Sequence, residues 1–267
     1  MTIRDRALAI FAFSILGVGV LVAQDREQPI NPAPPQGITP QQLIEKFAAK
    51  EEEFNLARER YTWRQTVKVQ TLDGDTVDGE YQLITDELFD DSGKRVQRVV
   101  YAPQSTLQRI GLTRNDMKDF ERGFPFVLTT DELPLYNISY AGQQHVDELD
   151  TYVFDVSPKK IEKSKRYFEG RIWVDNRDFQ IVKTKGKNVP DVRGKQEDLS
   201  PPFETYREQI DGKYWFPTYT RAEGNLHFRE QDVHVRQIIK YQNYKRYGAD
   251  VKITYEGKEV EQEKPKK

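Results

Sequence analysis

The sequence predicts a mainly β protein with a few helices, in which a strongly curved antiparallel sheet carries a helix and a lid on its concave face. Three observations indicate this fold class. Alternating apolar and polar residues fill most of the chain after residue 60, turn signals separate these segments, and one amphipathic helix precedes them. Aromatic residues make up 12% of the 267 residues, a content typical of sheet proteins and not of disordered chains.

A helix is predicted from Pro40 because the surrounding residues match a helix start. Thr39 can cap the helix, Pro40 suits its first turn, and Gln42 completes a capping box with Thr39. A single apolar stripe follows, so we expect the helix to cover one face of a sheet, with the acidic residues 51–53 in water. The stripe consists of Leu43, Ile44, Phe47, Ala48, Phe54 and Ala57.

The strands are predicted from period-two alternation between turn signals such as Asp73-Gly74 and Asp211-Gly212. Consecutive hairpins predict one continuous antiparallel sheet. An open sheet of about ten strands is expected to curl strongly. The predicted strands are 61–72, 76–89, 95–102, 136–146, 149–157, 166–174, 179–186, 203–210, 214–223 and 226–247, with a short additional strand at 106–112.

Residues 113–135 interrupt this alternation. Thr113 can cap a short helix that ends at Arg122, and the apolar stretches 124–128 and 133–135 that follow have no strand period. Such a segment inside a β protein is typical of a cover or lid. A curled sheet with a helix and a lid on its hollow side would enclose an apolar cavity.

The first 23 residues have the three parts of a secretory signal peptide. Arg4 and Arg6 give a positive start, residues 7–22 are uncharged and apolar, and polar residues follow Ala23. The run of 16 residues is shorter than the about 20 that a membrane-spanning helix needs, so cleavage after Ala23 is favoured over an uncleaved anchor. The predicted organisation is a signal peptide at 1–23, a Pro-rich linker at 24–38, one domain at 39–247 and a charged flexible tail at 248–267.

Composition excludes several classes of function. The chain has no cysteine, which excludes disulfides, thiol catalysis, thiolate metal sites and a lipid anchor on a cysteine. The formal net charge of −2, with both signs interspersed, gives no basis for nucleic-acid binding.

No group of residues predicts catalysis or a metal site. His227 and His234 are seven residues apart and would face opposite sides of a regular strand, while His145 lies far from both in sequence. Motifs of serine hydrolases, zinc proteases and nucleotide-binding proteins are absent. Neighbouring carboxylates such as Asp90 and Asp91 fall in predicted turns. We therefore expect a protein that is not an enzyme and has no cofactor.

Two further patterns have alternative interpretations. The basic run Lys159–Arg166 can contact anionic lipid head groups or an acidic partner, but a solvated loop is favoured because Glu162 dilutes its charge. Large aromatic residues on the strands can form ordinary core or line a ligand cavity. Core is the default for any single residue, and a cavity is considered because one helix and one lid cover the sheet.

Several segments resemble the LolA-like family of lipoprotein carriers, which includes outer-membrane lipoprotein-sorting proteins. They are Tyr61–Val69 (Tyr-Thr-Trp-Arg-Gln-Thr-Val-Lys-Val), Gly79–Tyr81 (Gly-Glu-Tyr), Tyr167–Asp175 (Tyr-Phe-Glu-Gly-Arg-Ile-Trp-Val-Asp), Phe179–Lys183 (Phe-Gln-Ile-Val-Lys) and the hairpin Glu204–Pro217. With the capped helix, the resemblance covers residues 40–247. It implies a half-barrel whose concave, helix-lidded apolar face holds the acyl chains of a lipoprotein or another lipid for transfer towards the outer membrane.

The resemblance also implies a location, partners and site residues. The protein is expected in the periplasm as a monomer that binds lipoprotein acyl chains or other lipid and meets membrane-protein donors or acceptors transiently. Arg95 is the nearest candidate for the arginine that controls the lid in the best-known carriers. The alternative on the same fold is a periplasmic sensor or regulator that binds lipoprotein or a membrane signalling partner. The residues expected to line the lipid cavity are Trp63, Val67, Leu83, Tyr101, Phe120, Phe126, Leu128, Phe168, Ile172, Trp173 and Phe216.

Overall fold

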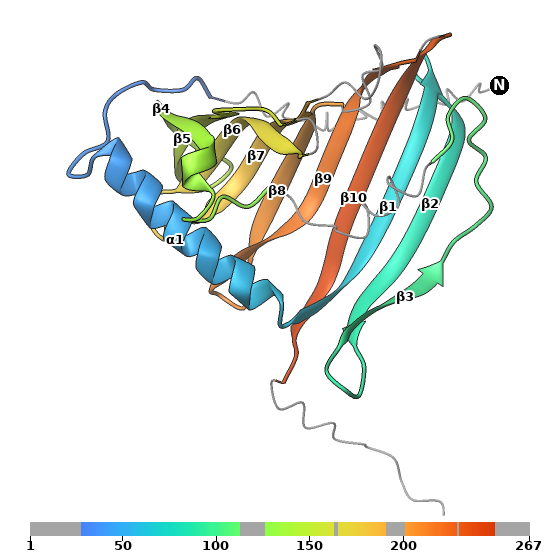
Figure 1. Cartoon of the computed structure of the whole chain (residues 1–267), viewed down its shortest axis with the longest axis horizontal. Coiled ribbons are helices and arrows are strands. Elements are labelled where there is room, and N and C mark those ends of the chain that lie inside the picture. The colour runs from blue at the N-terminus through green and yellow to red at the C-terminus, as the bar shows by residue number, and fades with distance from the viewer. Residues whose placement is uncertain (1–27, 113–125, 163–164, 191–200, 229, 249–267) are drawn as a thin grey trace, which may run out of the picture.

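A computed structural model describes residues 28–112, 126–162, 165–190, 201–228 and 230–248. Within these ranges the protein is one ten-stranded antiparallel sheet with one α-helix and one 3₁₀ turn (Figure 1). The predicted mainly β class is therefore confirmed. The elements are α1 (Pro40–Arg58), β1 (Tyr61–Asp73), β2 (Thr76–Phe89), β3 (Arg95–Tyr101), η1 (Leu133–Leu135), β4 (Tyr136–Val146), β5 (Leu149–Pro158), β6 (Tyr167–Asp175), β7 (Ile181–Val189), β8 (Phe203–Ile210), β9 (Tyr214–His227) and β10 (Asp232–Arg246).

The strand order is β3-β2-β1-β10-β9-β8-β7-β6-β5-β4. Consecutive strands pair as hairpins, as predicted, with one exception between β3 and β4. These two strands form opposite edges of the sheet, and the first strand pairs instead with the last, from Tyr61 opposite Arg246 to Leu72 opposite His234. The pairing of β1 with β10 therefore places the two ends of the domain side by side in the middle of the sheet.

The expectation of a strongly curved half-barrel is wrong. The sheet is open and is not strongly curled, and the β3 and β4 edges lie far apart (Figure 1). The physical reason is that α1 and residues 126–128 pack directly on the apolar face of the sheet. This layer buries the face, so the sheet does not need to fold over itself to remove the face from water.

Three sequence-predicted boundaries need correction. Residues 106–112 form no strand; Thr106 instead donates its backbone N–H to the Glu80 carbonyl (2.9 Å), which holds this segment beside β2. Leu226 and His227 belong to β9, and β10 begins only at Asp232. The short helix expected at 113–122 lies outside the described residues.

The predicted start of α1 is confirmed in detail. The Thr39 side chain accepts a hydrogen bond from the Gln42 backbone N–H, and the Gln42 side chain accepts one from the Thr39 N–H (2.9 Å). Local sequence is sufficient to fix this helix start, because both partners lie within one turn. The expectation that residues 51–53 face water is wrong for Glu51, which is fully buried together with Phe47 and Phe54.

The sheet has two chemically different sides. We call the side that α1 covers the helix-covered face and the opposite side the outer face (Figure 1). In β1 the predicted alternation is confirmed: Trp63, Val67 and Val69 are buried, while the intervening side chains are half-buried. Most of the large apolar side chains of the sheet thus belong to the helix-covered face.

The predicted Pro-rich linker lies along the edge strand β4 where it is described, from residue 28. Asn31 and Gln143 exchange two backbone hydrogen bonds of 2.8 Å each, and the Tyr140 hydroxyl donates to the Ala33 carbonyl (3.0 Å). Gly142 is required at this contact, since a Cβ there would lie 2.3 Å from the Asn31 carbonyl oxygen. The linker therefore covers the β4 edge.

Within the described residues, no helix combines the length and the apolar character that crossing a bilayer requires. The predicted signal peptide at 1–23 and most of the predicted tail at 248–267 lie outside the described residues. The division of the chain into these segments stays a prediction.

Candidate functional site

The most extensive apolar layer of the protein lies between α1 and strands β4–β7. Phe47 of α1 contacts Phe154 of β5 with ring centroids 5.3 Å apart. Phe126, in the segment that was predicted to be a lid, stacks on Phe168 of β6 at 4.4 Å. The neighbouring Leu128 is fully buried in the same cluster. The segment is therefore a cover on the helix-covered face, as expected from its aperiodic apolar sequence.

A chain of aromatic contacts extends this layer across the sheet to β1. Phe54 of α1 packs edge-on against Phe216 of β9 (5.1 Å), and Phe216 contacts Tyr61 of β1 (4.6 Å). Tyr244 of β10 lies 4.6 Å from Phe216 and 6.3 Å from Trp63, measured between ring centroids. The helix-covered face is thus aromatic from β5 to β1, which suits apolar ligands better than polar ones.

One buried ion pair holds α1 and the cover segment onto this face. Arg207 of β8 donates from Nη1 to Glu51 Oε1 (2.8 Å) and from Nη2 to Glu51 Oε2 (3.1 Å). Both side chains are almost fully buried, with 1% and 0% of their surface exposed. Nη2 also donates to the Phe126 carbonyl oxygen (2.8 Å), so a single guanidinium group joins the helix, the sheet and the cover segment.

Burial sets the electrostatics of this contact. The pKa of Glu51 is raised above its usual value because burial disfavours the carboxylate, and this effect outweighs the attraction of Arg207. The pKa of Arg58, which lies close to the same pair, is lowered by burial and by the nearby positive charge of Arg207. Removal of two charges from water is costly and is offset only by good geometry. The ion pair therefore adds little net free energy to the apolar packing of Phe126 and Leu128 that holds the cover.

Arg95, the predicted lid-control residue, contacts the C-terminal end of α1. Its guanidinium group donates to the carbonyl oxygens of Tyr61 (3.1 Å), Arg58 (3.2 Å) and Glu59 (3.0 Å). It also lies 4.7 Å from the ring centroid of Trp63. A cation at the last carbonyls of a helix is favourable, so Arg95 fixes the end of α1 to β3.

The structure brings most of the predicted cavity residues to the helix-covered face. They lie in three adjoining clusters of buried side chains, and Phe126 is partly buried on one of them. Phe120 lies outside the described residues. The residues on this face are Phe126, Leu128, Phe168 and Ile172 in the cluster under α1, Phe216 in the cluster beside Tyr61, and Trp63, Val67 and Leu83 in the cluster on β1, β2 and β10.

Two predicted residues lie elsewhere. Trp173 follows Ile172 on β6 and therefore points to the outer face, where it packs with Val153 and Val182. Its indole N–H donates to the side chain of Gln144 (2.5 Å). Tyr101 lies on the edge strand β3 and is half exposed. Neither residue shares a cluster with Phe126.

Glu51 and Arg207 were not predicted as site residues, although the helix pattern contains a signal for Glu51. Glu51 is four residues after Phe47 and three before Phe54, which places it inside the apolar stripe. A carboxylate at that position needs a buried partner. No local pattern points to Arg207, which is 156 residues away in sequence.

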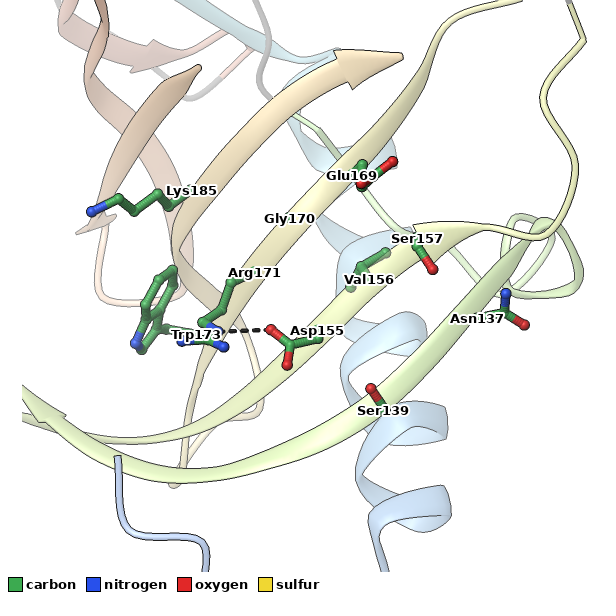
Figure 2. Close-up of a pocket in the computed structure, with 10 residues that line it drawn as sticks. All are labelled: Asn137, Ser139, Asp155, Val156, Ser157, Glu169, Gly170, Arg171, Trp173 and Lys185. Carbon is green, nitrogen blue, oxygen red and sulfur yellow. Dashed lines mark hydrogen bonds and ion pairs between the residues drawn. The ribbon is translucent and has the colours of Figure 1, made fainter. Parts of the chain in front are cut away.

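A second, polar hollow lies on the outer face of strands β4–β7 (Figure 2). Its volume is about 530 Å³. The Arg171 guanidinium donates to Asp155 (2.8 Å) within it, so these two charges already satisfy each other. Figure 2 shows Trp173 beside this pair, with α1 behind the strands. The hollow is lined by Asn137, Ser139, Asp155, Val156, Ser157, Glu169, Gly170, Arg171, Trp173 and Lys185.

The histidines do not gather at one place. His145 contacts Asp150 (2.9 Å) and His227 contacts Asp232 (2.8 Å), while His234 contacts Asn225. Across the described part of the chain, no group of three or more histidine and carboxylate side chains has the arrangement of a metal site.

Comparison with known proteins gives fold neighbours at low similarity. No family model and no curated protein matches the chain. Several solved structures match at low identity. A DUF1329 family protein from Desulfovibrio piger ATCC 29098 has 15% identity and a TM-score of 0.39, with 79% of this chain and 94% of that chain covered.

A LolA superfamily protein from Nitrosomonas europaea has 14% identity and a TM-score of 0.34, with coverage of 78% and 94%. A putative outer membrane lipoprotein-sorting protein domain from Vibrio parahaemolyticus has 11% identity and a TM-score of 0.33, with coverage of 77% and 94%. The structural neighbours thus include a LolA superfamily protein and a lipoprotein-sorting protein domain.

Proposed function

We propose that this protein is a periplasmic carrier, without enzymatic activity, that binds the acyl chains of lipoproteins or other lipids for transfer towards the outer membrane. The proposal places the acyl chains on the helix-covered face, between the sheet on one side and α1 with residues 126–128 on the other. The observation that carries the proposal is the Arg207 contact, because one guanidinium group bonds to both covering elements and so couples them.

The chemistry of the covered face supports an acyl ligand. Phe168 and Phe216 are aromatic, uncharged and buried under the covering elements, and the part of the cover that contacts Phe168 is a short aperiodic segment instead of a strand. Each methylene group removed from water contributes about 0.8 kcal/mol. A chain of twelve or more carbons could therefore replace the apolar contacts that the cover makes with the sheet.

A carrier must also release its ligand, which requires a cover that opens. Glu51 and Arg207 are buried with their charges, so separation of the two groups exposes both to water and recovers their hydration. This recovered hydration lowers the free-energy cost of opening, whereas a purely apolar contact gains no hydration when it opens. The pair can thus fix the position of the closed cover while adding little to the free energy needed to open it.

The deciding experiment is native mass spectrometry of the full chain after export in a bacterial host. We expect a fraction of the protein to carry bound acyl lipid, whose mass identifies a phospholipid, a fatty acid or a lipoprotein. Protein without lipid but in stable complex with a membrane regulator would contradict the carrier function. The Phe126→Asp variant serves as the matched control, since it places a charge against Phe168 and should lack the bound lipid.

A further inference from the structure

The edge strand β3 presents an unusual surface for a sheet edge. Val99 and Tyr101 are 58% and 50% exposed, and Val96 and Val100 are also exposed. These four side chains come from a strand of seven residues. On the side away from β2, β3 pairs with no strand of the described part of the chain. A free edge with exposed apolar residues is a template for strand addition.

The opposite edge, β4, is partly covered, in contrast to β3 within the described residues. The linker bonds to β4 through Asn31 and Gln143. The free side of β2 beyond the end of β3 is covered by Thr106, whose backbone and side chain bond to Glu80. The described residues therefore cover part of β4 and the first part of β2, and none of them pairs with the outer side of β3.

The hydrogen-bonding groups that β3 offers can be assigned from its hairpin with β2. The Asp90 N–H donates to the Lys94 carbonyl (2.9 Å). From there the two strands pair regularly, from Phe89 opposite Arg95 to Thr85 opposite Val99. In an antiparallel ladder, bonded and non-bonded pairs alternate. The backbone groups of Val96 and Arg98 therefore point to β2, and those of Gln97 and Val99 point outward.

The charge of β3 limits what can add to it. The strand contains Arg95 and Arg98 and no acidic residue. Arg98 is 66% exposed and shares the single carboxylate of Asp86 with Arg64, at 2.8 and 2.7 Å. A second copy of β3 would bring like charges opposite each other, which is unfavourable across strands. The surface therefore fits an acidic strand and not another copy of itself.

We propose that β3 is a docking site for an extended segment of a partner protein in which apolar residues alternate with aspartate or glutamate. The segment adds to the sheet as an eleventh strand: its backbone bonds to Gln97 and Val99, and its carboxylates lie on the side of Arg98. The site is separate from the helix-covered face, so it does not depend on lipid binding.

The experiment measures binding of fluorescent nine-residue peptides to the full chain by anisotropy. One peptide alternates valine with glutamate, and the second alternates valine with lysine. We expect the glutamate peptide to bind at least about tenfold more tightly, because its charges complement Arg98. Arg98→Glu is expected to reverse this preference. Hydrogen exchange with the glutamate peptide should slow at the amides of Gln97 and Val99.

Val99→Pro removes one outward N–H and should weaken binding of the glutamate peptide about tenfold or more. Val99→Ala keeps that N–H and is the matched control, expected to bind within about threefold of the native chain. Circular dichroism checks that both variants fold. Absence of binding, equal binding of both peptides, or protection away from β3 overturns the proposal. Concentration-dependent dimerisation that protects β3 overturns it in favour of a second copy.

Discussion

Arg207 and Glu51 form a bidentate ion pair that is buried between the sheet and the first helix, with N–O distances of 2.8 and 3.1 Å. The two residues are 156 positions apart, so the contact connects the start of the domain to β8. The Phe126 carbonyl oxygen accepts from the same guanidinium group. One side chain therefore contacts both α1 and the cover segment, in addition to the apolar packing that holds each of them on the sheet.

Removal of either partner leaves a buried charge without compensation. We expect Arg207→Ala or Glu51→Ala to lower the free energy of unfolding by about 3–5 kcal/mol. Urea denaturation followed by circular dichroism measures this change. The control is Lys50→Ala, which removes an exposed pair with Glu53 (2.9 Å) and should change the free energy of unfolding by less than about 1 kcal/mol.

Replacement of both partners tests whether the pair serves stability or opening. The double variant Glu51→Leu with Arg207→Met replaces the buried charges by apolar groups and should regain most of the lost free energy of unfolding. It should also slow release of a bound fatty acid, because opening no longer recovers hydration of the charges. If the double variant releases the fatty acid as fast as the native protein does, the ion pair has no role in opening.

Acid should weaken the protein through Glu223. Its pKa is lowered to about 2 by hydrogen bonds from Arg236, with further contributions from Arg221 and His234. A carboxylate with a lowered pKa stabilises the fold above its unfolded pKa of about 4.5, and this stabilisation is lost as the pH falls from about 5 to about 2.

The difference in free energy of unfolding between the native chain and Glu223→Gln measures this effect. We expect about 1 kcal/mol at pH 7 and a value near zero at about pH 2, from urea titrations at each pH. Salt at about 1 M should reduce the difference at pH 7, because these side chains are partly exposed. A difference that stays constant across this range contradicts the assignment.

The close approach of β6 and β7 should make Gly170 intolerant of a side chain. A Cβ at Gly170 would lie 2.3 Å from the Lys185 carbonyl oxygen and 2.5 Å from the Cα of Gly186. We expect Gly170→Ala to lower the free energy of unfolding by about 1–3 kcal/mol. Gly111→Ala is the control: a Cβ there meets no atom within 4 Å, so the change should stay within about 0.5 kcal/mol. Equal effects of the two substitutions would show that β6 and β7 are further apart.

The parts of the fold that depend on local sequence were predictable. The capping box at Thr39 and Gln42 involves residues within one turn, and tight turns join β1 to β2, β4 to β5 and β8 to β9. The separation of β3 from β4 and the pairing of β1 with β10 depend on contacts across the whole chain. Alternation alone contains no information about which distant strands become neighbours.

The sequence indicated most of the residues of the candidate site, but not how they are arranged. Phe126, Phe168 and Ile172 were expected to line one cavity, and they lie together in the cluster under α1. Trp173 was assigned with them, although adjacent residues of a strand point to opposite faces, and it lies on the outer face. The burial of Glu51 depends on a partner in β8, which helix periodicity cannot identify.

Acyl-chain length gives the sharpest test of the helix-covered face. If that face buries the chain, a series of fluorescent fatty acids should bind more tightly by up to about fourfold for each added methylene, the equivalent of about 0.8 kcal/mol. Phe126→Asp should remove this dependence, since its carboxylate would lie against Phe168, whereas Val99→Asp on the distant strand β3 should leave it unchanged. If affinity for the native protein does not vary with chain length, the protein binds only the head group of the fatty acid. Because Phe126 is only partly buried, the fold should survive the substitution, and circular dichroism separates loss of binding from loss of structure.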